Sequence, residues 1–353
     1  KGSNVKILDG KVVVVTGAGG GLGASHAMLM AKHGAKVVVN DPGMLRDGSG
    51  GSSNAADSVV SKIIELGGTA IADYNNISTT EGAKALIDKT ILTYNKIDIL
   101  INNAGILRDK TLHNMTDDMW DSVVAVHLRG TFACTREAAK HMKQNGGGSI
   151  INTTSVSGLK GNFGQANYSA AKAGIYGFTL TTSMELQRDN IRVNSIAPLA
   201  KTRMTSDVDS IPDDFKPEHV SDIVLFLASD ESKNITGRTI GIHGKSIFEY
   251  KMQISHEASS DSNWTVSEIG KWINSKDEPK QVELPKNIET DACLKLKKVI
   301  SSLPQAFKSE SGAGWNAILN FSTDVGNWYV SISNGVVTTS ETKIDGVTCI
   351  ITA

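Results

Sequence analysis

The chain has 353 residues, of which 40% are hydrophobic and 21% are charged, so it is long enough for two domains with buried cores. A formal net charge of -1 gives no general attraction to nucleic acid, and no apolar run approaches the roughly 20 residues that cross a bilayer, so neither a nucleic-acid partner nor a membrane span is expected. Cys134, Cys293 and Cys349 are odd in number and widely spaced, which disfavours disulfides and a metal site and indicates a reducing, intracellular compartment.

Short runs rich in valine and isoleucine alternate with helical patterns from about residue 11 to residue 241. The expected strands are "KVVVVTG", "AKVVVND", "TAIADY", "IDILINNAG", "GSIINTTS" and "IRVNSIAP". The expected helices are "ASHAMLMAKHG", "NAADSVVSKIIELGG" and "TDDMWDSVVAVHLRGTFACTREAAKHMKQNGGG", the last capped by Thr116. Runs of β-branched residues without polar alternation indicate strands covered on both faces. This order predicts a doubly wound α/β domain with a parallel sheet of the Rossmann type.

The composition changes after about residue 255. Residues 256–287 are polar and contain proline, as in a surface linker, although "WTVSEIGKWI" is expected to form a short helix. From residue 288 an amphipathic helix, "CLKLKKVISSLPQAF", is followed by the expected strands "NAILNFSTD", "NWYVSISNG" and "DGVTCIITA". We therefore predict a cofactor-binding domain at 1–255, a linker at 256–287 and a smaller α+β module at 288–353.

A glycine-rich turn joins the first expected strand to a helix in "VVVVTGAGGGLGAS". Gly17, Gly21 and Gly23 allow a tight turn, so the N–H groups at the start of the helix can face a pyrophosphate. Asp41 ends the second strand, where a carboxylate can accept hydrogen bonds from the adenosine ribose and repel a 2′-phosphate. Arg46 could offset that repulsion. The pattern predicts NAD as the cofactor.

Three further residues are predicted to contact the cofactor. Asn103, Ala104 and Gly105 follow the fourth strand at the carboxyl edge of the sheet, where ligands bind in open α/β folds. Their small side chains would let a cofactor approach the backbone, and they would equally suit an ordinary strand end.

A serine, a tyrosine and a lysine supply the predicted chemistry. Tyr168 and Lys172 are one helical turn apart and share a face, and Ser155 ends the fifth strand shortly before them. Ser155 would bind the substrate oxygen, and Tyr168 would remove the alcohol proton as hydride leaves for the nicotinamide. Lys172 would hold the nicotinamide ribose. A free phenol has a pKa of about 10, and the nearby ammonium together with the positive nicotinamide ring is expected to lower it.

To about residue 241 the chain resembles a short-chain dehydrogenase/reductase, through "TGAGGGLG", "NNAG", Ser155, "YSAAK" and "APLAKTRM". The segments "NDPGMLRDGSG", "AGILRDKTLHNMTDDMWDSVVAVHLRGTF" and "SGLKGNFGQANYSAAKAG" resemble the (3R)-hydroxyacyl-CoA dehydrogenase units of peroxisomal multifunctional enzymes of type 2. This resemblance implies oxidation of (3R)-3-hydroxyacyl-CoA to 3-ketoacyl-CoA with NAD in fatty-acid β-oxidation. It also implies a peroxisomal location, or a cytoplasmic one in a prokaryote or without targeting.

The same resemblance assigns roles to single residues. It implies that Leu22 belongs to the cofactor set, that Thr202 touches the nicotinamide amide, and that Asn75 lies beside the adenine, where the subgroup commonly has an acid. His127 stands where many members have Asn, and its implied role is to hold a water in a proton relay behind Lys172. A buried structural histidine is the alternative.

The last part of the chain is similar to the start of a sterol-carrier-protein-type lipid-binding domain, through "FSTDVGNWYVSISNGVV". The similarity covers about two thirds of that fold, without its closing helix and strand, and no hydratase domain follows the dehydrogenase. Whether the module binds lipid stays open.

Two other functions are compatible with the same sequence features, and one helix predicts an oligomer. The first alternative is a reductase of 3-ketoacyl thioesters, steroids or sugar alcohols that uses NADPH, and the second is a lipid carrier or scaffold with a vestigial dehydrogenase domain. The helix at 168–186 is apolar or small on nearly all faces, which predicts a homodimer or homotetramer packed through it.

Overall fold

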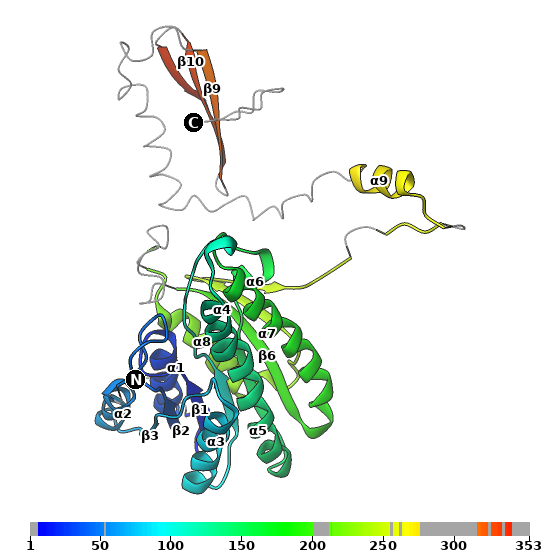
Figure 1. The fold of residues 1–353 in the computed structure, drawn as a ribbon. Coiled ribbons are helices and arrows are strands. Elements are labelled where there is room, and N and C mark those ends of the chain that lie inside the picture. The colour runs from blue at the N-terminus through cyan, green and yellow to red at the C-terminus, as the bar shows by residue number, and fades with distance from the viewer. Residues whose placement is uncertain are drawn as a thin grey trace. The chain divides into compact units, whose positions relative to one another are not determined.

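The structure is a computed structural model. It describes residues 6–52, 54–200, 212, 214–254, 257–260 and 263–275, and the backbone of 316–323, 326–333 and 336–340. The chain divides into two compact units, Lys1–Ser255 and His256–Ala353 (Figure 1). All the residues predicted to form the active site belong to the first unit.

A sheet of eight strands forms the centre of the first unit, in the order β3-β2-β1-β4-β5-β6-β7-β8. The strands are β1 (Val12–Thr16), β2 (Lys36–Asn40), β3 (Thr69–Asp73), β4 (Ile99–Asn102), β5 (Gly148–Thr153), β6 (Ile191–Leu199), β7 (Thr239–His243) and β8 (Ser246–Tyr250). The pairs from β3 through β7 are parallel, whereas β8 pairs antiparallel with β7. The strand order reverses beside β1, as in a doubly wound fold. The predicted fold class is confirmed, and β7 and β8 add to the six predicted strands.

Helices cover both faces of this sheet (Figure 1). They are α1 (Gly21–Lys32), α2 (Asn54–Glu65), α3 (Thr80–Tyr94), α4 (Asp117–Val124), α5 (Gly130–Gln144), α6 (Val156–Lys160), α7 (Ala166–Glu185) and α8 (Pro217–Ala228). Val13 and Val15 of β1 pack into one buried cluster with α1 and α8, and Val14 packs into another with α3 and α5. Successive side chains of a strand point to opposite faces, so an unbroken valine run serves both layers.

The long helix predicted after residue 116 is present but not uniform. Thr116 caps α4 as predicted, because its hydroxyl accepts a hydrogen bond from Met119 N at 3.3 Å. A π-helical turn, Ala125–Arg129, then joins α4 to α5. Such turns insert one residue into a helix and are frequent at functional sites. The sequence pattern did not predict this turn.

The second unit contains α9 (Val266–Asn274), β9 (Asn316–Thr323), β10 (Gly326–Ser333) and β11 (Val336–Ser340). The three strands form an antiparallel sheet in the order β11-β10-β9. The predicted short helix and the first two predicted strands are confirmed, and β11 was not predicted. The helix expected in "CLKLKKVISSLPQAF" and the strand expected in "DGVTCIITA" lie outside the described residues. None of the described helices has the length and hydrophobicity that a membrane crossing requires.

Candidate active site

The glycine-rich turn after β1 packs directly against the end of β4. Gly17 has a φ of +63°, and a Cβ built on it would lie 2.6 Å from Ala104 Cα, so only glycine fits. A Cβ on Gly23 would lie 2.2 Å from the Gly17 carbonyl oxygen. Asn103 Nδ2 donates hydrogen bonds to the carbonyl oxygens of Thr16 (3.0 Å) and Gly17 (3.1 Å). The structure therefore brings both predicted cofactor segments together at the carboxyl edge of the sheet.

The first turn of α1 has the features of an anion site. Gly20 is the N-cap and has no side chain to accept a hydrogen bond from the first turn, which carries no acidic residue. A Cβ on Gly20 would meet nothing within 4 Å, so space is open beside this N-cap. Free N–H groups and the helix dipole favour a negative group here. The pyrophosphate of a dinucleotide fits this end of the helix.

Asp41 follows β2 next to the same turn. Its Oδ2 accepts a hydrogen bond from Gly19 N at 2.8 Å, and its Oδ1 accepts one from Gly43 N at 2.7 Å. Asp41 N donates to the Asp73 carbonyl oxygen at 2.9 Å, which aligns the ends of β2 and β3. Asn75 lies two residues beyond β3, on the same edge. The residues predicted to hold the adenosine half thus occupy neighbouring strand ends.

Tyr168 and Lys172 lie on one face of α7, as their spacing predicts. The Lys172 side chain is buried, and its ammonium nitrogen lies 5.5 Å from the centre of the Tyr168 ring. Lys172 Nζ donates to the Thr153 carbonyl oxygen at 2.6 Å. Ser155 caps α6 just beyond β5, where its hydroxyl accepts a hydrogen bond from Ser157 N at 3.2 Å. The three predicted catalytic side chains therefore meet beside the end of β5.

The pKa values in this cleft are set mainly by burial. Burial raises the pKa of the Tyr168 phenol to about 12, while a hydrogen bond with the Ser155 side chain acts in the opposite direction. Burial lowers the pKa of the Lys172 ammonium to about 7. The sequence-based expectation was a tyrosine pKa lowered by Lys172 and by a bound nicotinamide ring, and the comparison here is for the protein without cofactor. The structure differs because loss of solvent around the half-buried ring outweighs the favourable interactions of its phenolate.

His127 lies in the π-helical turn and is buried against the segment that follows β4. Its Nε2 is 3.0 Å from Ile106 N and 2.8 Å from the Ile106 carbonyl oxygen, and its ring meets the Tyr168 ring edge-on at 5.1 Å. A Cβ on Gly105 would lie 2.3 Å from His127 Cε1. Burial, followed by the Lys172 charge, holds the His127 pKa well below its usual value. Nδ1 is buried with no hydrogen-bond partner among the described residues.

Comparison with known proteins identifies the family. The model of the "short chain dehydrogenase" family matches residues 11–212, more than half of the chain. The chain belongs to the short-chain dehydrogenase family. The family's fold implies a nicotinamide cofactor, and every residue of the site just described lies within the matched residues.

Three relatives show how far the likeness extends. Peroxisomal multifunctional enzyme type 2 of Mus musculus is 46% identical over 233 residues, which are 65% of this chain and 31% of that enzyme. The 3-oxoacyl-[acyl-carrier-protein] reductase FabG of Thermotoga maritima is 39% identical over 252 residues, covering 67% of this chain and 98% of the reductase. A short chain dehydrogenase from Mycobacterium avium has a crystal structure with a TM-score of 0.69 and 43% identity, covering 76% of this chain and 94% of that one. The chain thus spans about a third of the mouse enzyme.

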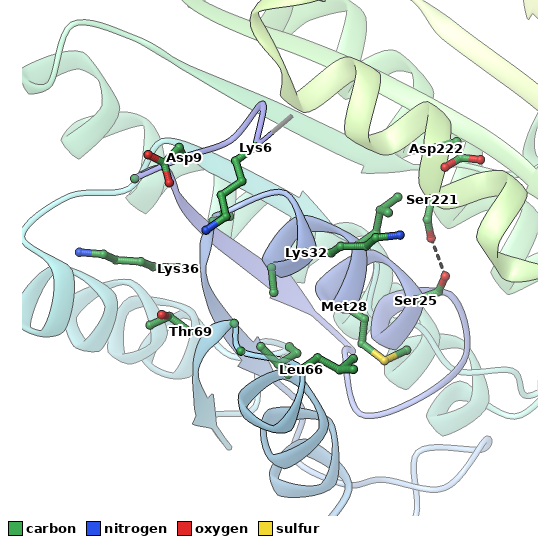
Figure 2. A pocket seen from close by; sticks show the side chains of 18 of the residues that line it. Lys6, Asp9, Ser25, Met28, Lys32, Lys36, Leu66, Thr69, Ser221 and Asp222 are labelled. Carbon is green, nitrogen blue, oxygen red and sulfur yellow. Dashed lines mark hydrogen bonds between the residues drawn. The ribbon is translucent and has the colours of Figure 1, made fainter. Parts of the chain in front are cut away.

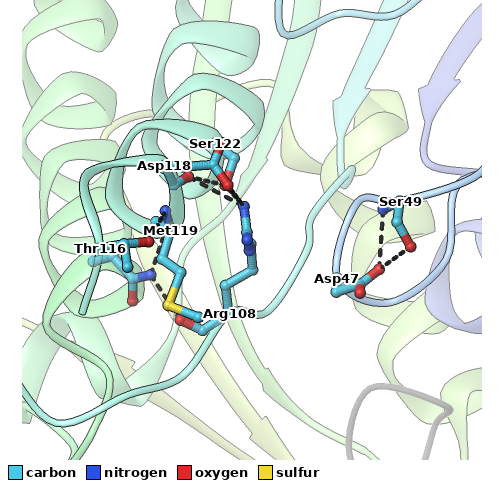
Figure 3. Close-up of polar contacts among 8 residues, drawn as sticks. Asp47, Ser49, Arg108, Thr116, Asp118, Met119 and Ser122 are labelled. Atoms are coloured by element: carbon cyan, nitrogen blue, oxygen red, sulfur yellow. Dashed lines mark hydrogen bonds and ion pairs between the residues drawn. The ribbon is translucent and has the colours of Figure 1, made fainter. Parts of the chain in front are cut away.

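One buried residue of this dehydrogenase was not predicted from the sequence. Asn167, directly before Tyr168, donates from Nδ2 to the carbonyl oxygens of Arg108 (3.0 Å) and Met119 (2.9 Å), and its Oδ1 accepts from Tyr168 N (2.7 Å). The Arg108 side chain in turn forms an ion pair with Asp118 (Figure 3). Asn167 therefore joins the start of α7 to the segment after β4 and to α4. Its only signal in the sequence is its place beside Tyr168.

Two predicted features remain to be placed. Thr202 lies outside the described residues. Within the described part of the chain, no cluster of three or more His, Cys, Asp or Glu side chains is arranged to bind a metal. The predicted site therefore consists, in the described residues, of the glycine turn, the strand ends and the cluster around Tyr168.

A cavity of about 820 Å³ lies elsewhere in the dehydrogenase (Figure 2). Its lining includes Lys36 and Thr69, the first residues of β2 and β3, so it reaches the amino-terminal edge of the sheet. On its wall Ser25 of α1 and Ser221 of α8 form a hydrogen bond at 2.7 Å. None of the predicted site residues lines it. It is therefore separate from the candidate active site.

Proposed function

We propose that this short-chain dehydrogenase oxidises (3R)-3-hydroxyacyl-CoA to 3-ketoacyl-CoA with NAD, as a step of fatty-acid β-oxidation. The observation that carries the proposal is the meeting of Ser155, Tyr168 and Lys172 at the edge of the sheet that also carries the glycine turn and Asp41. The 46% identity to a peroxisomal multifunctional enzyme supports the acyl-CoA substrate and a peroxisomal location.

In the proposed reaction the Ser155 hydroxyl donates a hydrogen bond to the 3-hydroxyl oxygen of the substrate. Tyr168, as the phenolate, accepts the hydroxyl proton, and the C3–H bond breaks with its electron pair as the carbonyl forms. NAD, when bound, supplies the positively charged ring that accepts this hydride. Lys172 holds the nicotinamide ribose, and while it is protonated, below a pH of about 7 in the folded protein, its charge favours the phenolate. His127 holds, at its unpartnered Nδ1, the water through which the proton leaves.

The raised pKa of Tyr168 sets the direction of the pH dependence. Since the phenol holds its proton up to a pH of about 12 in the cleft without cofactor, oxidation should accelerate as the pH rises above neutrality. A cationic nicotinamide ring favours the phenolate and should move the midpoint of the profile to lower pH. Measuring kcat/KM from pH 6 to pH 10 tests this, and a rate that falls as the pH rises would contradict the role of Tyr168 as the base.

A substrate assay tests the function. Both enantiomers of short-chain and long-chain 3-hydroxyacyl-CoA are offered with NAD and with NADP, and turnover of the (3R) form with NAD is expected. Tyr168→Phe should lower turnover by about 10²- to 10⁴-fold, as expected for loss of a general base. It should leave NAD binding nearly intact, which an isothermal titration would measure. Wild-type rates in this variant would refute the mechanism.

The cofactor preference is proposed to depend on Asp41. Its carboxylate, fixed by Gly19 N and Gly43 N, can accept from the ribose hydroxyls of NAD and would repel the 2′-phosphate of NADP. Asp41→Ala should therefore weaken NAD binding and bring the affinities for NAD and NADP closer together. Tighter binding of NADP than of NAD by the wild-type protein would overturn this part of the proposal.

A second candidate function is the reduction of 3-ketoacyl thioesters with NADPH. It is favoured by the similarity to the Thermotoga maritima reductase, which extends over 98% of that enzyme. The same assay run in reverse separates the two candidates. Faster reduction of 3-ketoacyl-[acyl-carrier-protein] with NADPH than oxidation of 3-hydroxyacyl-CoA with NAD would favour the reductase.

We also propose that the protein forms a homodimer or homotetramer through α7 and its neighbour α5. Phe132 of α5 and Phe178 of α7 stack edge-on with ring centres 6.3 Å apart, and Phe132 is 41% exposed. Met184 on α7 is 69% exposed. Large exposed apolar side chains on two adjacent helices are typical of a protein–protein interface. Light scattering that shows a stable monomer at micromolar concentration would contradict this assembly.

A further inference from the structure

The loop between α6 and α7 carries a phenylalanine that is open to solvent. Phe163 is 89% exposed. Gly161 and Gly164, close to it on either side, have φ values of +80° and +77°. A Cβ built on Gly161 would meet no atom within 4 Å, so space is open beside the loop. The flat apolar ring of Phe163 is therefore accessible to a ligand.

A second segment holds this loop in place. Lys110 N donates a hydrogen bond to the Gly164 carbonyl oxygen at 2.9 Å, and Lys110 pairs with Gln165 in a parallel bridge. Gln165 Nε2 donates to Asp109 Oδ2 at 2.7 Å, and Asn162 Nδ2 donates to Gln165 Oε1 at 2.9 Å. A ring on a loop fixed in this way loses little conformational freedom when it binds a ligand.

Two lysines adjoin the ring. Lys160 ends α6 three residues before Phe163, and Lys110 is bonded to the residue that follows Phe163. Within the described residues, neither ammonium group has an ion-pair partner. The neighbouring acid, Asp109, is bonded to Gln165. An aromatic ring beside two ammonium groups suits a ligand that joins a planar base to phosphate groups.

The same loop connects two of the proposed catalytic residues. Ser155 caps α6 and Tyr168 lies in the first turn of α7, so the loop lies between them in the chain. Phe163 precedes Tyr168 by five residues, which keeps their Cα atoms within about 18 Å. Burial, and then the Lys160 charge, lowers the pKa of His243 at the end of β7, so Lys160 lies near the catalytic edge of the sheet. A long substrate that reacts at Tyr168 can therefore extend to Phe163.

We infer that Phe163, Lys110 and Lys160 bind the nucleotide end of coenzyme A, with its adenine on the phenyl ring and its phosphates beside the ammonium groups. The inference rests on the acyl-CoA substrate proposed above. Coenzyme A carries its thioester and its nucleotide at opposite ends of a pantetheine arm, so one molecule can occupy the catalytic site and this loop together. Stacking of a base on an aromatic side chain should change affinity about tenfold.

The test compares substrates with and without the nucleotide, using the full chain and NAD. The probes are (3R)-3-hydroxybutyryl-CoA and (3R)-3-hydroxybutyryl-pantetheine, and kcat/KM is measured for each. Phe163→Ala should lower the CoA-to-pantetheine ratio of these values about tenfold, whereas Phe163→Trp should retain the ratio because it keeps a stacking surface. Leu92→Ala is the matched control, since Leu92 on α3 is 86% exposed. It should keep the wild-type ratio.

The two lysines provide a second readout, the dependence on salt. Lys110→Gln and Lys160→Gln should each lower the ratio about threefold. Each should also make the ratio less sensitive to sodium chloride, because salt screens contacts between exposed ammonium and phosphate groups. Lys62→Gln is the control for charge, since Lys62 is an exposed residue of α2. Its ratio and its salt dependence should match the wild type.

Four results would count against the inference. Equal kcat/KM values of the wild type for the two thioesters would refute it without any variant. Equal losses on both thioesters in Phe163→Ala would show that the ring supports the catalytic site and not the nucleotide. A larger loss with the acyl-carrier-protein thioester than with the CoA thioester would assign the loop to a protein carrier. If the wild type turns over no 3-hydroxyacyl thioester, the proposed function fails as well, whereas turnover with an unchanged ratio in Phe163→Ala removes only the inference.

Discussion

The buried ammonium of Lys172 makes the stability of the protein depend on pH in a defined window. Burial lowers its pKa from the ordinary 10.5 to about 7. Between these two values the unfolded chain holds the proton and the folded protein releases it. A group with a lowered folded pKa favours the folded state above its unfolded pKa, and this contribution is lost as the pH falls toward the folded pKa.

The size of the effect follows from the two pKa values. Within the window the free energy of unfolding changes by about 1.4 kcal/mol for each pH unit, and partial protonation near pH 7 reduces the change at that end. From pH 7 to pH 9 the wild type should therefore gain roughly 2 kcal/mol relative to a variant that cannot titrate here. Lys172→Met is such a variant, because it keeps the length of the side chain without the amine.

The assay is urea unfolding at pH 7, 8 and 9 without cofactor, followed by far-UV circular dichroism. Comparing the pH slopes removes the constant cost of the hydrogen bond lost at Thr153 and the titration of all other groups. Lys62→Met is the control, because Lys62 is an exposed residue of α2 and its variant should parallel the wild type. If wild type and Lys172→Met show the same pH slope, the ammonium is solvated in the folded protein and the reasoning is wrong.

Three smaller perturbations test other contacts. Gly105→Ala drives a methyl group to 2.3 Å from His127 Cε1 and should cost about 1–3 kcal/mol by thermal unfolding, a cost that His127→Ala should relieve in the double variant. Ser221→Ala removes the hydroxyl 2.7 Å from Nδ1 of buried His26 and should lower stability by about 1–3 kcal/mol; a loss below half a kcal/mol would contradict it. Thr265→Ala breaks the capping box of α9 and should speed amide exchange in its first turn about fivefold, whereas unchanged exchange would show that the cap does not hold the helix.

Most of the fold could be predicted because the residue pattern of each helix or strand matches the faces that it buries in the folded protein. The valine run of β1 has no polar alternation because both faces of the strand are covered. Glycine is required at position 17 because its φ is positive and because a Cβ there would collide with Ala104. β8 was missed although Gly244 precedes it with a φ of +55°, a turn signal of the kind found in two-residue hairpins. A five-residue strand at a sheet edge carries too weak a pattern to stand out beside the buried strands.

The sequence was enough to predict that Ser155, Tyr168 and Lys172 lie close together, but not to predict their pKa shifts. The four-residue spacing of Tyr168 and Lys172 was enough to place them on one face. The direction of their pKa shifts depends on burial, which is created by segments distant in sequence. The π-helical turn at His127 and the three hydrogen bonds of Asn167 likewise depend on how α4, α7 and the segment after β4 pack together. No local pattern encodes that packing.

The antiparallel direction of β8 decides where the chain leaves the sheet. His243 ends β7 at the catalytic edge and pairs with Ser246, while Tyr250 at the end of β8 pairs with Thr239 at the start of β7. The chain therefore leaves the sheet at the edge opposite to Ser155 and Tyr168. A segment that continues the chain after β8 therefore starts at the amino-terminal edge of the sheet, away from the strand ends that carry the proposed catalytic side chains.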